Sequence, residues 1–573
     1  MQENFFSFPK GYEVGKTKFV IITGSVMSGV GKGTFSASLG NILKLYHGLK
    51  VSPVKFDGYF NVDAGTLNPY RHGEVFVLDD GTETDLDLGS YERMLNQNHT
   101  KDNYLTAGKL FKLIIDKERA GDYLGRDVQI IPHVTGEIKY FLRNLAMKGS
   151  KLEEKPKLTE SISNRDSTSN QPYADIVLME VGGTVGDIET SYFLEAMREL
   201  AYEEGRSNVC FVNVCYIVQP PSLGEHKSKA AQIGIRTLMQ TGIQPDIVIC
   251  RSHNPVSENI KEKMSVFSNV PVNRVFNMYD FGTIYTIPLF LQDLGIDSEV
   301  LKIIGLKSKT ANRDDFDRWK ELAEKFKSAK KQITIAITGK YTNVHDSYFS
   351  IIKAIEHTAP YYGVKAELRW VETTDIKNQE DAKNVLKDID GVIVPGGFGE
   401  RGVEGKIECV RYCRENNVPY FGLCYGFQMA VIEYARNVCN LACAHTTEVD
   451  PKTEHPVICI LPEQEEVKGL GGTMRLGGHD VVVKENTVAN KLYNSKKVRE
   501  RFRHRYNVNT KYIDQLEKFG LVFSGQASEK RIMQILELPN HKFFVGTQFH
   551  PELTSKPLEP NPLFRGFVEA CCR

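Results

Sequence analysis

Several features are missing from this sequence, and each absence narrows the class of protein. Net charge is missing, because 72 Lys and Arg residues balance 72 Asp and Glu residues. Without a net electrostatic attraction, neither nucleic acid nor an anionic membrane is expected as the main partner, and any anion site must be a local cluster. No apolar run approaches the length of a membrane span, and residues 1–17 lack the apolar core of a signal peptide. We therefore expect no membrane association.

A disulfide framework is also missing. The eleven cysteines are an odd number, run from Cys210 to Cys572 and form no CxxC pair. Cys439, Cys443 and His445 are close enough in sequence to suggest a metal site, but a fourth ligand is lacking. A reducing, cytoplasmic location fits this cysteine usage best.

The chain of 573 residues is too long for one hydrophobic core. Strands alternating with helices predict an α/β protein with two doubly wound, mostly parallel-sheet domains. The expected order is an N-terminal extension (1–17), a first domain (18–306), a linker helix (307–332) and a second domain (333–573). Within the first domain, residues 149–173 are polar and poor in bulky apolar side chains, and we interpret them as a mobile insertion.

The first domain opens on a candidate phosphate-binding loop, KFVIITGSVMSGVGKGT (18–34). An apolar strand runs into glycines and then into a helical pattern, so that backbone N–H groups, a helix N-terminus and Lys32 can face an anion. The spacing is not that of a standard P-loop, because six residues separate Gly24 from Gly31 and Gly33 follows the lysine. A glycine-rich turn at the end of a strand is the alternative.

Carboxylates and further lysines follow this loop. Residues 55–93 are dense in Asp, Gly and Tyr and show little helical or strand periodicity, which predicts a long functional loop. Its acids are either Mg²⁺ ligands or a solvated charge run. Glu180 ends an apolar strand, where it could face a metal-bound nucleotide or be a buried or capping residue. Lys227 and Lys229 are either a second polyphosphate grip or surface charges.

The second domain carries a candidate nucleophile. In VPYFGLCYGFQMAVIEYAR (418–436), Cys424 lies at a strand-to-helix corner that resembles a nucleophile elbow, and the helix N-terminus favours a thiolate. The glycine loop GVIVPGGFGERG (391–402) precedes it. In GTQFHPELTS, His550 and Glu552 would share one side of an extended segment, so that the carboxylate orients the imidazole. Each residue alone could be structural, but the combination is specific.

Two family resemblances rest on these motifs. G-x-C-x-G-x-Q, a distant H-P-E and an upstream P-G-G-F-G resemble class I glutamine amidotransferases. VMSGVGKG, NVDAGT, HGEVFVLDDGTETDLDLGSYER and EVGGTVGDIE resemble the synthetase half of the CTP synthase family. The match runs from about Phe19 to Val568. It implies formation of CTP from UTP, ATP and glutamine, with phosphorylation of the uracil 4-oxygen, Mg²⁺, activation by GTP and feedback inhibition by CTP. It also implies a homotetramer, and filaments remain open.

The resemblance implies the following site residues, by position. The glutaminase triad is Cys424, His550 and Glu552. ATP is bound by Gly29, Val30, Gly31, Lys32, Gly33, Thr34, Lys55 and Asp87, and Mg²⁺ by Asp87 and Glu180. UTP or CTP is bound by Ser28, Asp187, Ile188, Glu189, Lys227, Ser228, Lys229, Ala230, Ala231, Gln232 and Lys263. Glutamine is bound by Gly397, Tyr425, Gly426, Phe427, Gln428, Glu448 and Arg505. Arg401 and Arg475 resemble elements of GTP activation.

Some positions depart from the family pattern. Gly58 stands where a proline is usual, Ser25 where a glycine is usual, and Ala230-Ala231 where Pro-Thr is usual. Two alternatives stay open at this point. One is another ATP-dependent amidase, such as an amide synthase of the cobyrinate type, although residues 55–93 speak against it. The other is a catalytically inactive scaffold, against which the intact Lys32 and triad weigh.

Overall fold

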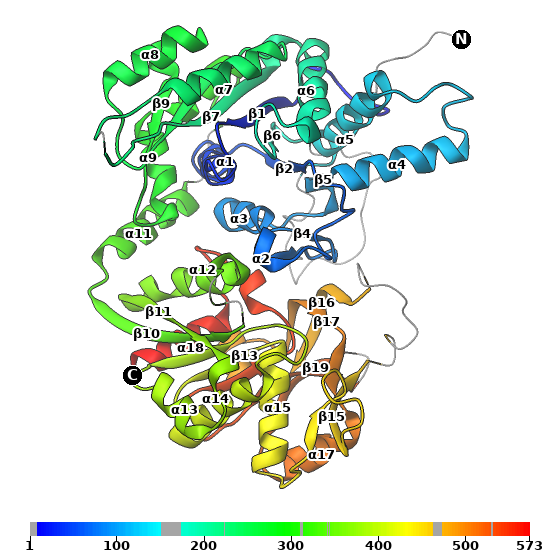
Figure 1. The fold of residues 1–573 in the computed structure, drawn as a ribbon, viewed down its shortest axis with the longest axis vertical. Coiled ribbons are helices and arrows are strands. Elements are labelled where there is room, and N and C mark those ends of the chain that lie inside the picture. The colour runs from blue at the N-terminus through cyan, green and yellow to red at the C-terminus, as the bar shows by residue number, and fades with distance from the viewer. Residues whose placement is uncertain are drawn as a thin grey trace. The chain divides into compact units, whose positions relative to one another are not determined.

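The structure is a computed structural model that describes residues 8–149, 173–222, 224–309, 313–340, 342, 344–461, 464, 473–528 and 531–573. Most of the expected insertion, 150–172, lies outside the described residues. The chain divides into two compact units (Figure 1). The first comprises Met1–Asp63 and Ser90–Lys320, and the second Ala64–Gly89 and Glu321–Arg573. The predicted domain boundaries at 306/307 and 332/333 stay predictions.

The first unit is built on a seven-stranded sheet with the order β5-β2-β6-β1-β7-β8-β9, in which every neighbouring pair is parallel. Its strands are β1 (Lys18–Ser25), β2 (Val51–Asp57), β5 (Tyr104–Thr106), β6 (Ile176–Val181), β7 (Val209–Tyr216), β8 (Ile247–Arg251) and β9 (Val275–Met278). The central strands are apolar and buried on both faces, as parallel strands covered by helices must be.

Helices cover both faces of this sheet (Figure 1). They are α1 (Lys32–Asn41), α4 (Ala107–Ala120), α5 (Thr135–Lys148), α6 (Ser191–Glu204), α7 (Lys229–Gln240), α8 (Glu258–Ser268), α9 (Ile287–Asp293) and α10 (Ile296–Ile304). Residues of α4, α5 and α6 form one core with strand residues such as Phe19 and Val177, and residues of α7 and α8 form another with Cys215 and Val248. Two further helices, α3 (Leu86–Leu95) and α11 (Asp314–Ser328), each contain residues assigned to both units.

The second unit contains a nine-stranded sheet with the order β11-β10-β12-β13-β21-β20-β19-β16-β17. Its first five strands are parallel and its last four antiparallel. The strands are β10 (Lys331–Gly339), β11 (Val364–Glu372), β12 (Gly391–Val394), β13 (Tyr420–Leu423), β16 (Arg475–Val483), β17 (Lys497–His504), β19 (Val522–Ala527), β20 (Met533–Glu537) and β21 (Phe544–Thr547). A small sheet of β14 (Ala444–Thr446), β15 (His455–Ile460) and β18 (Tyr506–Val508) accompanies it.

The helices of this unit also cover both faces of the sheet. They are α12 (Phe349–Thr358), α13 (Gln379–Val385), α14 (Val403–Asn416), α15 (Tyr425–Asn437), α16 (Val488–Tyr493), α17 (Thr510–Lys518) and α18 (Pro562–Cys572). In β10, Ile333, Ile335 and Ile337 pack with α12 and α18, whereas Ala336 faces the core of α14 and α15. This alternation is the period of two that a covered strand requires. The predicted fold class of two α/β domains is confirmed.

Segment 64–89 differs from the prediction of one long loop. It contains the short helix α2 (Pro69–His72) and the hairpin of β3 (Val75–Val77) and β4 (Glu83–Asp85). It also belongs to the second unit, although the chain on either side of it belongs to the first. Three-residue strands are too short to show periodicity, so the sequence pattern could not reveal them.

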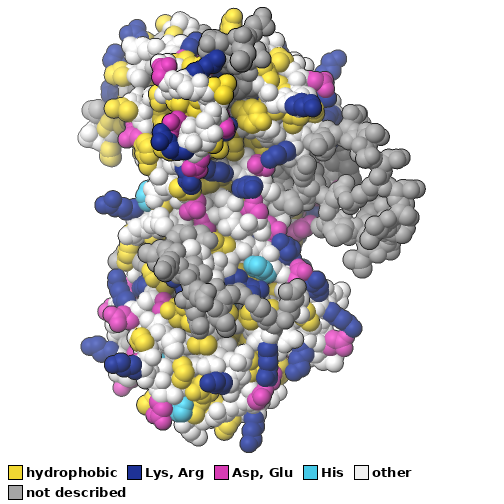
Figure 2. All heavy atoms as spheres, turned by 90° about the vertical axis from the view of Figure 1, so that its right-hand side faces the viewer, with side chains coloured by type: hydrophobic (Ala, Val, Ile, Leu, Met, Phe, Trp, Pro, Cys, Tyr) yellow, Lys and Arg dark blue, Asp and Glu magenta, His cyan; other side chains and the backbone are white. Residues whose placement is uncertain are grey.

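The surface agrees with the balanced composition. Figure 2 shows Lys and Arg side chains interspersed with Asp and Glu side chains over the face drawn. No described helix is both long and apolar enough to cross a membrane.

Candidate active sites

The nucleophile elbow forms at the junction of β13 and α15. Cys424 has φ 49° and ψ −91°, a strained conformation, and its side chain is buried. Its neighbours have to be glycines, because a Cβ atom at Gly426 would lie 2.1 Å from the Val394 carbonyl oxygen. A Cβ atom at Gly422 would lie 2.8 Å from the Gly426 carbonyl carbon. The local sequence therefore dictates the corner that presents the sulfur.

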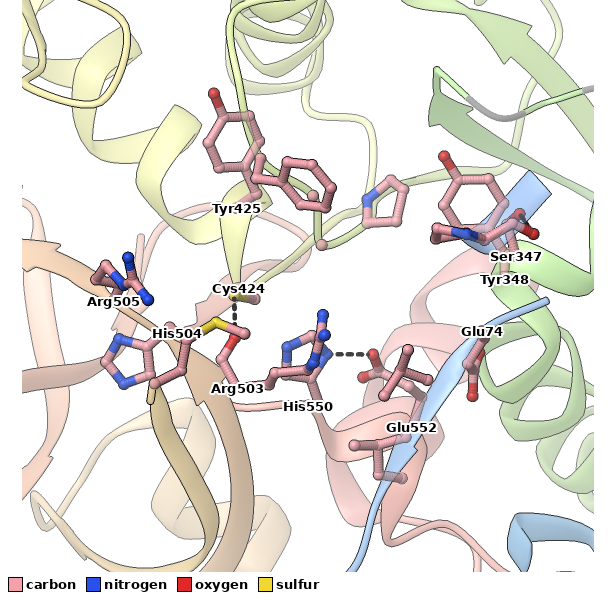
Figure 3. Close-up of a pocket in the computed structure, with 18 of the residues that line it drawn as sticks. Glu74, Ser347, Tyr348, Cys424, Tyr425, Arg503, His504, Arg505, His550 and Glu552 are labelled. Atoms are coloured by element: carbon pink, nitrogen blue, oxygen red, sulfur yellow. Dashed lines mark hydrogen bonds and ion pairs between the residues drawn. The ribbon is translucent and has the colours of Figure 1, made fainter. Parts of the chain in front are cut away.

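Among the described residues, the Cys424 sulfur has two hydrogen-bond partners. Its S–H donates to the Arg503 carbonyl oxygen over 3.7 Å, and the Gln548 amide Nε2–H donates to the sulfur over 3.5 Å. Figure 3 shows the first of these contacts, with His550 in the same pocket.

His550 and Glu552 pair as expected, with 2.7 Å between Nδ1 and Oε1. The predicted extended backbone is wrong, however, because Pro551–Leu553 forms a 3₁₀ turn with the proline at its start. The His550 Nε2 atom is buried and makes no hydrogen bond within the described part of the chain. Burial opposes a charged imidazole, yet the Glu552 carboxylate and the Cys424 sulfur outweigh it and raise the pKa of His550 well above its ordinary value. A raised pKa makes the imidazole a stronger base.

These residues line a cavity of about 540 Å³ in the second unit. Five of the seven expected glutamine-binding residues line it too, namely Gly397, Tyr425, Gln428, Glu448 and Arg505. Gly426 and Phe427 are not part of the lining, and Phe427 is fully buried. Part of the wall comes from segment 64–89, through residues such as Gly65, Glu74 and Val75. The sequence analysis missed this contribution, since nothing in the local pattern announces a contact with residues more than 300 positions away.

Glu448 and Arg505, two of the residues that line this cavity, are held by hydrogen bonds. Glu448 accepts a hydrogen bond of 2.7 Å from the Gly399 backbone N–H, and burial raises the pKa of its carboxyl. The Arg505 guanidinium donates to the Thr473 hydroxyl over 2.9 Å. Of the expected GTP elements, Arg401 is half exposed and lies 3.9 Å from Glu372, and the Arg475 guanidinium lies 5.5 Å from the Phe502 ring centre.

The phosphate-type loop of the first unit has the expected strand-loop-helix form. Gly29 and Gly31 have positive φ, and Lys32 begins α1. The Lys32 ammonium donates to the Gly183 carbonyl over 2.7 Å. A Cβ atom at Gly24 would lie 2.7 Å from the Lys32 side chain, so the lysine can lie back over the strand only because Gly24 has no side chain. Val30 is buried, Gly33 and Thr34 are half-buried, and Ser28 is exposed.

A buried ionic cluster lies at the carboxyl ends of β2 and β6. Lys55 and Glu180 are paired in register across these strands, and 2.9 Å separates Nζ from Oε1. The Tyr91 hydroxyl donates to the other oxygen of Glu180 over 2.7 Å, and burial with the Glu180 charge raises the pKa of Tyr91 well above its ordinary value. The sequence analysis missed Tyr91. Asp87 lies in the first turn of α3 and is grouped with the second unit, so its expected sharing of a metal with Glu180 stays a prediction.

The expected UTP residues lie on three elements of the first unit. Asp187, Ile188 and Glu189 lie at the 3₁₀ turn before α6, Lys227 to Gln232 lie at the start of α7, and Lys263 lies on α8. Ala230 and Ala231 are in the first turn of α7, where Ala231 is buried. The hydrogen bond from Lys227 and its charge lower the pKa of Glu225, and the charge of Lys263 adds to this effect.

Metal chemistry finds limited support from side chains alone. Among the residues that the structure describes, no three His, Cys, Asp or Glu side chains form a cluster that could hold a metal. Cys439, Cys443 and His445, for which the sequence already lacked a fourth ligand, are not such a cluster. The three are in different surroundings, since Cys439 is buried, Cys443 is exposed and His445 lies 3.5 Å from Glu404.

Two family models match successive parts of the chain. A family model described as CTP synthase N-terminus matches residues 18–306, and one described as glutamine amidotransferase class-I matches residues 343–570. A CTP synthase of Thermococcus gammatolerans is 47% identical over 97% of this chain and 98% of its own length. One of Sulfurisphaera tokodaii is 49% identical over 97% of this chain and 99% of its own length. Among solved structures, the glutaminase domain of Trypanosoma brucei CTPS with bound acivicin is 37% identical, with a TM-score of 0.40, over 42% of this chain and 94% of that one.

The elbow cysteine, the histidine–glutamate pair and the matched model define the second unit as a class I glutamine amidotransferase. Taken over its whole length, the chain belongs to the CTP synthase family (EC 6.3.4.2), carbon–nitrogen ligases of pyrimidine biosynthesis that use glutamine-derived ammonia. Its relatives decide against an amide synthase of the cobyrinate type. Membership of this family implies the use of ATP.

Proposed function

We propose that the second unit hydrolyses glutamine through Cys424. The sulfur attacks the side-chain amide carbon, the C–N bond breaks, and ammonia leaves a γ-glutamyl thioester that water then cleaves to glutamate and free thiol. His550 takes the thiol proton and delivers it to the departing nitrogen, while Glu552 holds the imidazole. The 2.7 Å contact between His550 and Glu552 carries this proposal, together with the burial of Cys424 in the same cavity.

The cavity wall offers groups for both ends of the substrate. Glu448 would meet the α-ammonium group of glutamine and Arg505 its α-carboxylate. Backbone N–H groups near Gly397 and Tyr425 would stabilise the oxyanion, as the glycine loop and the start of α15 border the nucleophile. Gly426 and Phe427 would act through the backbone of the elbow rather than by contact.

In the first unit, the uracil 4-oxygen of UTP would be phosphorylated by ATP before ammonia displaces the phosphate. The residues proposed for ATP are Gly29 to Thr34, Lys55 and Asp87, with Lys32 neutralising phosphate charge. UTP, or CTP as feedback inhibitor, would be held by Ser28, Asp187 to Glu189, Lys227 to Gln232 and Lys263. The positive charges of Lys227 and Lys263, which both act on Glu225, support a polyphosphate site on this surface.

Asp87 and Glu180 have the carboxylate oxygens that Mg²⁺ prefers, and so fit the expected ion. When bound, Mg²⁺ would neutralise phosphate charge. Because two carboxylates are too few to hold it alone, the nucleotide phosphates would supply the remaining ligands. Before the ion binds, Lys55 pairs with one oxygen of the Glu180 carboxylate and the Tyr91 hydroxyl donates to the other. GTP activation through Arg401 and Arg475, a homotetramer, filaments and a cytoplasmic location complete the proposal.

Product analysis with UTP, ATP and either glutamine or ammonia tests this assignment. We expect Cys424→Ala to abolish glutamine-dependent CTP formation and to retain ammonia-dependent formation, because only the source of ammonia is lost. Lys32→Ala should abolish both. Glutamine-dependent activity of Cys424→Ala equal to that of the parent chain would overturn the proposal.

A further inference from the structure

One side of β17 carries an arginine at every second position. Arg499, Arg501 and Arg503 alternate with Glu500 and Phe502, so their side chains share one side of the strand. We call these three residues the arginine row. All three contact segment 64–89, which lies in the same unit.

The outer contact of the row is an exposed ion pair. The Arg499 guanidinium binds the Asp79 carboxylate through two nitrogens, over 3.0–3.1 Å. About half of the Arg499 side chain, 52%, remains exposed. In the pairing of β16 with β17, Arg499 lies opposite Asp480 and not opposite a residue of the turn Pro551–Leu553.

The inner contacts are buried. Arg503 donates to the Glu83 carboxylate over 2.8 Å and to the Gly65 carbonyl over 3.1 Å. The Glu83 side chain is only 1% exposed, which makes the loss of its partner costly. Between the two ion pairs, the buried Arg501 guanidinium donates to the Val77 carbonyl over 3.2 Å.

The backbone of the same strand holds the catalytic residues. The Arg503 carbonyl oxygen accepts the S–H of Cys424 over 3.7 Å (Figure 3). The Arg501 carbonyl oxygen accepts the backbone N–H of His550 over 2.8 Å. Each inner arginine therefore contacts segment 64–89 with its side chain and the catalytic machinery with its peptide group.

We propose that Arg503 is a positioning residue for glutamine hydrolysis, through which segment 64–89 sets the orientation of the Cys424 thiol. This inference rests on the proposed role of Cys424 as nucleophile. The Arg503 carbonyl oxygen accepts the Cys424 S–H and so orients the side chain. The Glu83–Arg503 pair holds that peptide group in place, so releasing the pair leaves the sulfur less well aimed at the substrate.

The proposal separates two readouts. In Glu83→Gln or Arg503→Lys, the alkylation rate of Cys424 with iodoacetamide at neutral pH should stay within twofold of the parent, because this small reagent does not depend on the aim of the sulfur. The rate constant for glutamate release should fall about tenfold, equivalent to about 1.4 kcal/mol, with a smaller change in KM. General damage to the site would slow both reactions.

Arg499→Lys is the matched control, since it makes the same change at the exposed end of the row. Both of its rates should stay within twofold of the parent. Alkylation is followed by mass spectrometry of the peptide containing Cys424, because ten other cysteines are present. Melting temperatures verify folding, and Glu83→Gln tests the same pair if Arg503→Lys fails to fold.

Two results would overturn the proposal. One is that Arg503→Lys and Glu83→Gln match Arg499→Lys in both rates. The other is that alkylation and turnover slow together. Cys424→Ala separates this failure from failure of the proposed function. If Cys424→Ala still releases glutamate, Cys424 is not the nucleophile and the proposed function itself fails.

Discussion

At the scale of the residue, Lys406 on α14 is an unexpected charge. Only 1% of it is exposed, and its ammonium nitrogen lies 5.1 Å from the centre of the Tyr425 ring. Burial, reinforced by the charge of Lys340, lowers the pKa of Lys406 to about 7, although Glu372, Cys409 and Cys424 act in the opposite direction. The chain thus carries a lysine close to half ionisation beside the glutaminase cavity.

Lys406 makes stability depend on pH with a definite sign. The unfolded chain keeps this lysine protonated up to about pH 10.4, whereas the folded chain releases the proton near pH 7, so its unfavourable contribution is largest below pH 7. Lys406→Met, which conserves volume, should stabilise the protein by on the order of 4 kcal/mol at pH 7. The gain should shrink to about 1 kcal/mol or less near pH 10.

Thermal unfolding of both chains at several pH values between 7 and 10 measures this difference. Lys377→Met, at an exposed position, is the control and should shift the melting temperature little at any pH. A Lys406→Met gain that did not change with pH would show that packing, not the charge, sets the effect.

The proposed catalytic residues were identifiable as candidates from the sequence because their chemistry constrains the neighbouring positions. Cys424 required small neighbours at Gly422 and Gly426, and His550 and Glu552 are close enough in the chain to pair. Lys406, Tyr91 and Arg503 were not predictable. Each acquires its role from burial or from partners distant in sequence, and an isolated lysine, tyrosine or arginine has no local signature.

At the scale of the element, the packing of α7 on β1 explains one departure from the family pattern. Ser25, which stands where a glycine is usual, donates to the Asn213 side chain over 3.0 Å. A Cβ atom at Gly234 of α7 would lie 2.6 Å from the Ser25 Cβ. The Ser25 side chain at the end of β1 therefore fits because Gly234 of α7 has no side chain.

The contact between Ser25 and Gly234 predicts that substitutions at these two positions affect the free energy of unfolding in a strongly non-additive way. Glycine to alanine inside a helix usually stabilises by about 0.5–1 kcal/mol, but here overpacking should dominate and Gly234→Ala should destabilise by roughly 1–3 kcal/mol. In the Ser25→Gly background the same change should be neutral or stabilising. Equilibrium unfolding of the two single variants and the double variant measures the coupling, and additive effects would contradict the contact.

The long strands and helices followed their sequence patterns, whereas segment 64–89 did not. Buried strands such as β1 and β6 read as apolar runs, and α4 follows Thr106, which caps its first turn, so both kinds of element were predictable. The hairpin of β3 and β4 is held by contacts to β17, and alternating charges in β17 normally indicate a solvated strand. The assignment of segment 64–89 to the second unit depends on contacts between distant parts of the chain, which no local sequence pattern contains.

At the scale of the whole molecule, the two units perform chemistry that must share one nitrogen atom. Ammonia released into neutral water becomes mostly ammonium, which is not a nucleophile, so efficient synthesis requires that it remain sheltered from solvent. The two matched family models, a CTP synthase N-terminus and a class I glutamine amidotransferase, place both half-reactions on this chain. We therefore expect glutamine nitrogen to enter CTP without exchange with the solution.

Isotope competition tests this expectation. With glutamine labelled with ¹⁵N at the amide and unlabelled ammonium in the buffer, the new amino group of CTP should carry undiluted label. Cys424→Ala in the same mixture should give only unlabelled CTP, because it must draw on the buffer. Label that fell in proportion to added ammonium would show that the nitrogen equilibrates with solvent, and that the two half-reactions are coupled only by concentration.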